Sequence, residues 1–144
     1  MKTVLIGIVV LVVLGVGLFF FLGQKSQGGA SPGLVDGRLM ECPSSPNCVS
    51  SEDGTPEEKT VEPLPLSAWA QLPAVIADMG GVVTTQEDGY LAAEFTSKTF
   101  KFVDDLEFRL TEDAVHVRSA SRVGYSDRGV NGARVATLRE KLSP

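Results

Sequence analysis

The residues of this chain best suited to chemistry lie at positions 102–131, in the segment FVDDLEFRLTEDAVHVRSASRVGYSDRGVN. The segment contains six acidic residues and four arginines, set among apolar residues that alternate as they do in a β-strand. Charges at this density are costly to bury unless oppositely charged partners are built in. The segment is therefore either a paired structural network or a binding site, in which guanidinium groups would suit a phosphate or carboxylate.

The turn expected at residues 111–114 determines how the two charged strands pair. An even-length loop places Glu107 opposite Arg118, with Asp105 one step further along the same face. This face carries a ladder of alternating charge. The other two members of the ladder are Arg109 and His116, and we interpret these two and Glu107 as a solvated sheet face.

Asp104 differs from these residues, because the alternation places it on the apolar face of the same strand, beside Leu106 and Phe108. A carboxylate in that position needs a partner, and we predict that Arg122 from the following loop provides it. The acidic hairpin and the loop would then form one preorganised polar cluster.

The loop at residues 122–131 leads into the last predicted helix. Asn131 is a good N-cap for this helix, with Asp127 as an earlier alternative. Backbone donors at a helix start, close to arginines, would suit an anion; alternatively, Ser126 and Asp127 only cap the loop. The candidate ligand-binding residues are Asp104, Asp105, Glu107, Arg118, Arg122, Ser126, Asp127 and Asn131.

Catalysis finds less support in the sequence. His116 is the only histidine, so a Ser-His-Asp arrangement would have to include it, and the arginines expected beside it would lower its pKa. Asp105 and Glu107 remain an alternative acid/base pair for a hydrolase. No P-loop and no metal-ligand spacing is present, so we expect neither a cofactor nor a metal.

The secondary-structure elements that must position these residues are predicted to be a helix, four strands and a second helix, in that order. The first helix follows Ser67, and because of Pro73 it either kinks there or its regular part begins near Pro73. Strands are expected at residues 82–85, 90–96, 101–110 and 114–121, and the last helix at 133–142. Tight turns make such a sheet antiparallel, so we predict an α+β domain at residues 66–144 whose two helices cover one face.

An apolar run begins at Val4 and ends at Leu22, and its 19 residues include no charge. As a helix it would be about 28 Å long, close to the hydrocarbon thickness of a bilayer. No A-x-A-like cleavage site follows it, so we predict that residues 1–23 form an uncleaved single-span anchor, with a signal peptide as the alternative. Residues 24–65 then form a flexible tether that contains a cysteine loop.

Cys42 and Cys48 are the only cysteines of the chain. Two cysteines in a short exported domain form a disulfide more often than a metal site, which favours an extracytoplasmic location on an oxidising side of the membrane. Two free thiols on the cytoplasmic side are the alternative. A formal net charge of −5 and a pI near 4.8 argue against a nucleic-acid partner.

The chain resembles the family of proteins of unknown function numbered 1499 (DUF1499) over residues 42–142. The pieces that carry the resemblance are SPNCVSS at 45–51, FVDDLEF at 102–108, RSASRVGYSD at 118–127 and GVN at 129–131. The resemblance implies an exported or membrane-tethered setting and points to the same polar positions, but it implies no activity.

Three functions are consistent with these observations. The first is a non-catalytic, membrane-anchored binding module for an anionic small molecule, a lipid headgroup or a protein partner. The second is a hydrolase that uses the Asp/Glu/Arg cluster, and the third is a structural subunit of a membrane complex. The arginine clustering beside a glycine-containing loop favours the first.

Overall fold

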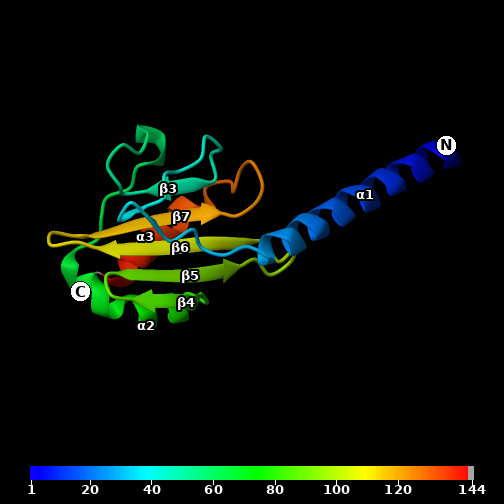
Figure 1. The fold of residues 1–144 in the computed structure, drawn as a ribbon. Helices are drawn as coiled ribbons and strands as arrows, with labels where there is room; N and C mark the ends of the chain where they lie inside the picture. Colours follow the sequence, from blue (N-terminus) through cyan, green and yellow to red (C-terminus); the bar gives the residue numbers. More distant parts are fainter. Residues whose placement is uncertain (143–144) are drawn as a thin grey trace.

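Five strands form one antiparallel sheet that organises the computed structural model, in the order β3-β7-β6-β5-β4 (Figure 1). The structure describes residues 1–142. The helical elements are α1 (Lys2–Gln27), the 3-10 helices η1 (Glu57–Lys59) and η2 (Leu66–Gln71), α2 (Leu72–Asp78) and α3 (Val130–Leu142). The strands are β1 (Leu34–Val35), β2 (Arg38–Leu39), β3 (Cys48–Ser50), β4 (Val82–Glu87), β5 (Tyr90–Thr96), β6 (Val103–Leu110) and β7 (Val115–Ser121).

The predicted α+β class is confirmed, with one strand more in the main sheet than the sequence indicated and a separate two-stranded sheet of β1 and β2. The additional strand is β3, which pairs with β7 at one edge of the sheet and comes from the region interpreted as a tether with a cysteine loop. A three-residue strand is too short to show the alternation by which a strand is recognised in a sequence. The folded domain therefore includes residues before position 66, where the sequence predicted that the domain begins.

The pairing of the charged strands agrees with the prediction. Glu107 lies opposite Arg118, and Arg109 lies opposite His116. The β4–β5 turn also lies where it was expected, and Gly89 supplies its positive φ of 74°. This register fixes which side chains of the hairpin share a face.

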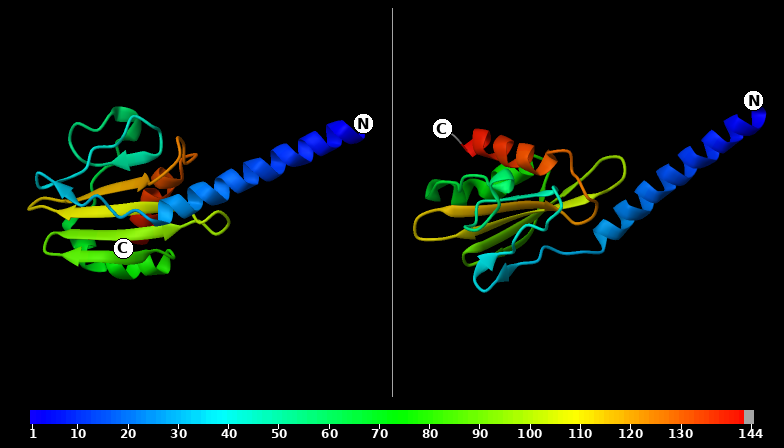
Figure 2. Two further views of the ribbon diagram at one scale, coloured as in Figure 1. Left: turned by 45° about the vertical axis from the view of Figure 1, so that its right-hand side comes forward. Right: turned by 90° about the horizontal axis from the view of Figure 1, so that it is seen from above.

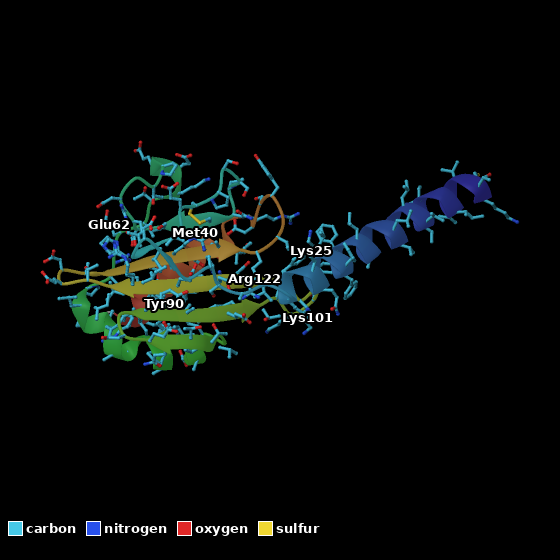
Figure 3. The ribbon with its side chains drawn as sticks, viewed as in Figure 1. Lys25, Met40, Glu62, Tyr90, Lys101 and Arg122 are labelled. Carbon is cyan, nitrogen blue, oxygen red and sulfur yellow. A yellow bond between two sulfur atoms is a disulfide. The ribbon has the colours of Figure 1, made fainter. Side chains whose placement is uncertain are left out.

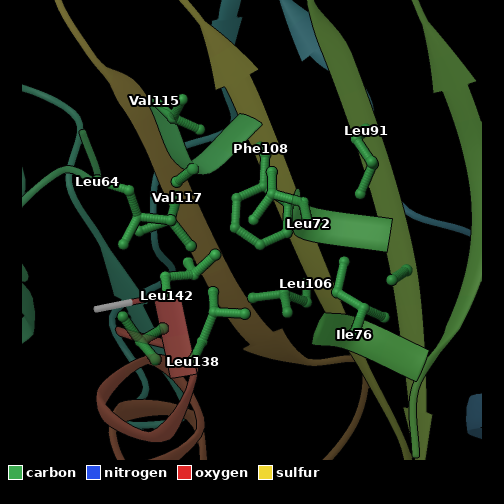
Figure 4. Packing of buried hydrophobic residues seen from close by; sticks show 13 residues of the cluster. Leu64, Leu72, Ile76, Leu91, Leu106, Phe108, Val115, Val117, Leu138 and Leu142 are labelled. Atoms are coloured by element: carbon green, nitrogen blue, oxygen red, sulfur yellow. The ribbon is translucent and has the colours of Figure 1, made fainter. Parts of the chain in front are cut away.

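One face of the sheet carries the apolar core, covered by η2, α2 and α3 (Figure 2, right). Figure 4 shows Phe108 and Leu106 of β6 packing against Leu72, Ile76 and Leu138 from these helices. The helix predicted after Ser67 begins as a 3-10 helix and becomes α-helical only at Leu72. Pro73 is the reason, because proline fits the first turn of an α-helix but not its interior.

The opposite face of the sheet is polar, and the chain between α1 and β3 covers it (Figure 2, right). We call residues 29–39 of this covering chain the strap. Glu107 is completely buried beneath it, so the prediction of a solvated face is wrong for this residue, and Asp105 beside it is 3% exposed. Nothing in the sequence indicated this cover, because the strap has the composition of a flexible linker. Its hydrogen bonds and its one small apolar cluster, Leu39 with Tyr90 and Ala92, form no periodic pattern.

The first helix projects from one end of the sheet (Figure 1). It is long and apolar enough to cross a membrane, and its apolar stretch is not buried against the rest of the protein. Only its last turns touch the domain, where Gly23 and Ser26 are buried. The anchor prediction is therefore compatible with the structure in length and composition.

Candidate functional site

A buried ion pair lies at the centre of the polar face. Nη1 of Arg118 donates to Oε2 of Glu107 over 2.7 Å, and both side chains lie beneath the strap. The other carboxylate oxygen of Glu107 accepts from the Tyr90 hydroxyl at 2.8 Å and from the backbone N–H of Gly33 at 3.1 Å. Two strands and the strap therefore meet at this one carboxylate.

A second pair lies next to it, toward α1. Nε and Nη2 of Arg122 donate to the two carboxylate oxygens of Asp105 over 2.9 and 2.6 Å, a bidentate arrangement. Arg122 also pairs with Glu94 of β5, and its Nη1 donates to the carbonyls of Ser26 and Gly29 at the end of α1. Figure 3 shows Arg122 where α1 meets the sheet.

The environment shifts the pKa values of three of these groups. Burial raises the pKa of Glu107 above its ordinary value, and the charge of Arg118 offsets this only in part. Burial, together with the charge of Glu107, raises the pKa of Tyr90. Hydrogen bonding to Asp105 raises the pKa of Arg122, which stays charged. The cluster therefore keeps Arg122 charged and the Tyr90 phenol protonated, and Glu107 is the group whose charge burial disfavours.

Glu52 forms a third ionic centre, which the sequence analysis missed. Arg109 donates to both of its carboxylate oxygens, at 2.7 and 2.8 Å, and Arg38 and the N–H of Leu39 add further hydrogen bonds. Burial alone would raise the pKa of Glu52, but the hydrogen bonds and the charge of Arg109 lower it to about 2. Glu52 thus ties β2 to the sheet.

Asp104 lies on the other face of the sheet and does not join this cluster. Its carboxylate pairs with Arg134 of α3 at 2.6 Å, so the prediction that Arg122 is its partner is wrong. The alternation correctly predicted the face of the sheet on which Asp104 lies. Arg122 comes four positions after Arg118, so it lies on the same face as Arg118, toward the strap. The polar residues therefore form two clusters separated by the sheet, and not the single cluster that was predicted.

The loop before α3 is capped from within. The carboxylate of Asp127 accepts from the N–H groups of Gly129 and Asn131, and the Ser126 hydroxyl accepts from the N–H of Arg128. Asp127, the alternative N-cap, has the capping role, and the prediction of Asn131 as N-cap is wrong. Asn131 is instead completely buried within α3, where it bonds the Ser119 hydroxyl and the carbonyl of Asn47.

The predicted disulfide between Cys42 and Cys48 is confirmed. It lies at the start of β3, and Asn47 beside it bonds both Asn131 of α3 and the carbonyl of Gly124. The cysteine loop is therefore fastened to the sheet edge and to the loop before α3. This is a reason for its short spacing of six positions.

A pocket of about 360 Å³ opens between the end of α1, the strap and the polar face. The charged side chains that line it are Lys25, Asp105, Arg118 and Arg122. Arg118 is 6% exposed, and its Nε is buried without a hydrogen-bond partner among the residues that the structure describes. A buried guanidinium N–H with no acceptor is costly, and a bound anion would satisfy it.

Residues 38–142 match the family described as "Protein of unknown function (DUF1499)". The chain belongs to this family. Neither a curated protein nor a solved structure matches it. The DUF1499 match includes Arg38, Glu52 and both cysteines, so the β2–Glu52 contact lies inside the family region, whereas α1 and the first part of the strap precede it. The pocket of this DUF1499 protein is thus built partly from residues outside that region.

The structure brings together four of the predicted site residues of this DUF1499 chain: Asp105, Glu107, Arg118 and Arg122. Tyr90, which also contacts them, could have been found, because YLAAEF at residues 90–95 places it on the same face as Glu94. Glu52 and the strap gave no such signal, because they contact the sheet from far away in the chain.

The geometry around His116 does not resemble a catalytic triad. Its Nδ1 lies 3.4 Å from the Ser51 hydroxyl and 4.0 Å from Glu52, so the potential nucleophile and acid face the same ring nitrogen. Ser51 also accepts from the N–H of Val117 at 2.8 Å, which is a structural role. Within residues 1–142, no group of three or more His, Cys, Asp or Glu side chains is placed to hold a metal ion.

Proposed function

We propose that this DUF1499 protein is a membrane-anchored, non-catalytic module that binds a small anion, a phosphate or carboxylate group, in the pocket beside α1. The observation that carries the proposal is Arg118, which lines that pocket and whose Nε is buried without a hydrogen-bond partner among the described residues. Each of the neighbouring carboxylates already has a guanidinium partner, so they do not compete for this donor.

Two further features support an anion rather than a cation or an apolar ligand. Lys25 is exposed at the rim of the pocket and adds a positive charge. The pKa of Arg122 is raised by its carboxylate partners, which keeps a second cation in the wall at every physiological pH. An anion that enters would thus meet one unpaired N–H donor and a flexible ammonium group.

The location of the pocket next to the end of α1 makes lipid headgroups and small solutes of the membrane surface its natural sources of anions. With α1 as a span, the pocket would lie about one to two helical turns beyond the apolar stretch, at the level of the headgroups. The extracytoplasmic side is the side we propose, because the Cys42–Cys48 disulfide requires an oxidising compartment.

The hydrolase alternative is less consistent with the contacts. Both carboxylate oxygens of Asp105 and of Glu107 accept hydrogen bonds, and Glu107 is completely buried. A general acid or base must be within hydrogen-bond reach of the substrate. This pair is engaged in holding the strap, so its role is structural.

The test is a titration of the full chain in lipid nanodiscs with inorganic phosphate and, separately, with acetate. Arginine side-chain N–H signals in the NMR spectrum report the bound anion, and we expect the Arg118 Nε–H signal to shift and saturate. A short-chain phosphatidylglycerol in a third titration distinguishes a lipid headgroup from the free ion.

Arg118→Lys keeps a positive charge beside Glu107 but removes Nε, so it should abolish the saturable binding while the protein stays folded. Arg128→Lys makes the same change at an exposed arginine outside the pocket and should bind as the wild type does. An Arg118 signal that stays fixed with all three anions would refute the proposal.

A further inference from the structure

The turn between β5 and β6 lies directly beside α1. At its tip Phe100 packs against Phe19 and Phe20 of α1, with ring centroids 5.2 Å apart in each case. Phe102 continues the cluster, at 6.2 Å from both Phe19 and Phe100. These four aromatic rings, which we call the aromatic junction, connect a loop of the domain to the apolar helix.

Backbone contacts hold the aromatic junction in one geometry. A Cβ atom added to Gly23 would lie 1.7 Å from the carbonyl oxygen of Phe100, so only glycine permits this approach. The Ser26 hydroxyl accepts from the N–H of Val103 at 3.1 Å and donates to the carbonyl of Gly23. The start of β6 is therefore hydrogen-bonded to the last turn of α1, and the backbone of Phe100 lies against Gly23.

The position of these rings along α1 determines their depth. Phe19 and Phe20 lie within the apolar run that ends at Leu22, and at about 1.5 Å per residue they are within about 5 Å of its end. If α1 spans a bilayer, Phe100 must lie at the same depth, near the boundary between hydrocarbon and headgroups. Aromatic side chains are enriched at this boundary.

Two lysines lie on either side of Phe100 in the turn. Lys98 and Lys101 are exposed, and Figure 3 shows Lys25 and Lys101 on either side of the place where α1 meets the domain. Lysines beside aromatic residues fit a membrane surface, because their alkyl chains lie along the apolar layer while the ammonium groups reach the lipid phosphates.

We propose that the β5–β6 turn is a second membrane-contacting element of this protein, with Phe100 inserted into the lipid interface and Lys98 and Lys101 at the level of the phosphates. The proposal rests on the anchoring part of the proposed function, namely that α1 spans a bilayer, and not on anion binding in the pocket. The domain would then be held against the membrane at two points.

The experiment uses the full chain in phosphatidylcholine vesicles that contain lipids brominated at defined acyl-chain depths. Trp69 is the only tryptophan, so Phe100→Trp in a Trp69→Phe background gives a single fluorophore at the tip of the turn. We expect loss of its emission, strongest with bromines close to the headgroups. The same probe placed by Asp113→Trp, in the exposed β6–β7 turn at the other end of β6, should keep its emission.

Matched glycine variants of the Phe100→Trp chain test whether α1 holds the turn in place. Gly23→Leu should restore much of the emission of the fluorophore, because the added side chain collides with the carbonyl of residue 100. Gly17→Leu adds the same side chain where nothing lies within 4 Å, and quenching should persist.

Flotation of the vesicles separates the two proposals. A chain that does not float with the vesicles would show that the anchoring itself is wrong. A Phe100→Trp chain that floats while its fluorophore stays unquenched would overturn the second contact alone.

Discussion

The two faces of the central sheet are both buried, but they are buried by different means. Phe108 and Glu107 are neighbours on β6, point to opposite faces and are each completely inaccessible to solvent. Phe108 lies among apolar side chains of three helical elements. Glu107 lies under the strap, where it accepts hydrogen bonds from the N–H of Gly33 in the strap and from the Tyr90 hydroxyl of β5. The comparison shows that a cover with a single small apolar contact, that of Leu39 with Tyr90 and Ala92, can exclude water when the charges beneath it are matched.

The two kinds of burial have different energetic consequences. The stability gained from apolar burial grows with the area that is buried, and an apolar core tolerates many substitutions by apolar residues of similar volume. A buried ion pair contributes little net stability, yet removal of one partner is costly because it leaves the other charge without compensation. The polar face should therefore be fragile to single changes and tolerant of paired ones.

The largest effect should come from breaking the pair between Glu107 and Arg118. Arg118→Met leaves a buried carboxylate alone and should lower the free energy of unfolding by about 3–5 kcal/mol. The double variant Glu107→Leu/Arg118→Met should recover most of this loss, as measured by urea unfolding of the full chain in detergent.

Phe108→Ala on the other face is the reference for this experiment. Because it leaves a cavity, this substitution should lower the free energy of unfolding by about 3–5 kcal/mol. No second substitution on the polar face should recover that loss. A double variant at positions 107 and 118 that is no more stable than Arg118→Met would show that the two faces do not differ in this respect.

A smaller effect should appear in the pH dependence through Glu52. Its pKa is about 2 in the folded protein, against an ordinary value of 4.5, so its contribution is complete above pH 4.5 and is lost as the pH falls toward 2. Glu52→Gln should lower stability at neutral pH by about 2 kcal/mol and flatten the acid limb of the stability curve.

Glu57→Gln, at an exposed position, is the matched control, and its stability should fall at acidic pH as steeply as that of the wild type. The pKa of Glu107 is raised in the folded protein, so its effect on the pH dependence of stability is opposite to that of Glu52. Its contribution to stability is present at low pH and is lost as the pH rises. Because Glu107 is unchanged in both variants, the difference between them isolates Glu52. An acid limb that is equally steep in Glu52→Gln would remove Glu52 as its cause.

The smallest of these effects should follow from opening the disulfide. Replacing Cys42 and Cys48 by alanine releases a short loop, for which chain entropy predicts a loss of about 2 kcal/mol. Because the loop leads into the cover of the polar face, hydrogen exchange should accelerate at the N–H of Leu39 more than at that of Leu106 in the core. Equal acceleration at both would show that the disulfide stabilises the fold as a whole.

The sequence predicted the parts of the molecule whose contacts are local. The hairpin register, the inward position of Asp104 and the helix start near Pro73 all follow from alternation, loop length and proline geometry. Partners separated by large distances in the chain were assigned wrongly. Arg134 and Arg122 were both possible partners of Asp104 by composition. Only the alternation along β7, continued by one residue to Arg122, argued against Arg122.

The strap illustrates a different limit of sequence reasoning. Its residues are those of a flexible linker, and the contacts that hold it come from single N–H groups such as those of Gly33 and Leu39. No pattern in a sequence marks a backbone donor that will meet a carboxylate seventy residues away. The same holds for Glu52, whose partner Arg109 is 57 positions distant.

The attachment of the strap also sets how far the domain can move. As a random coil, the glycine- and serine-rich segment at residues 23–37 would give the domain a search radius of about 20 Å around its anchor. Arg122 and the strap contacts remove that freedom by fixing both ends of the segment to the sheet. A molecule that engages this domain must consequently diffuse to it, since the domain cannot reach out to capture one.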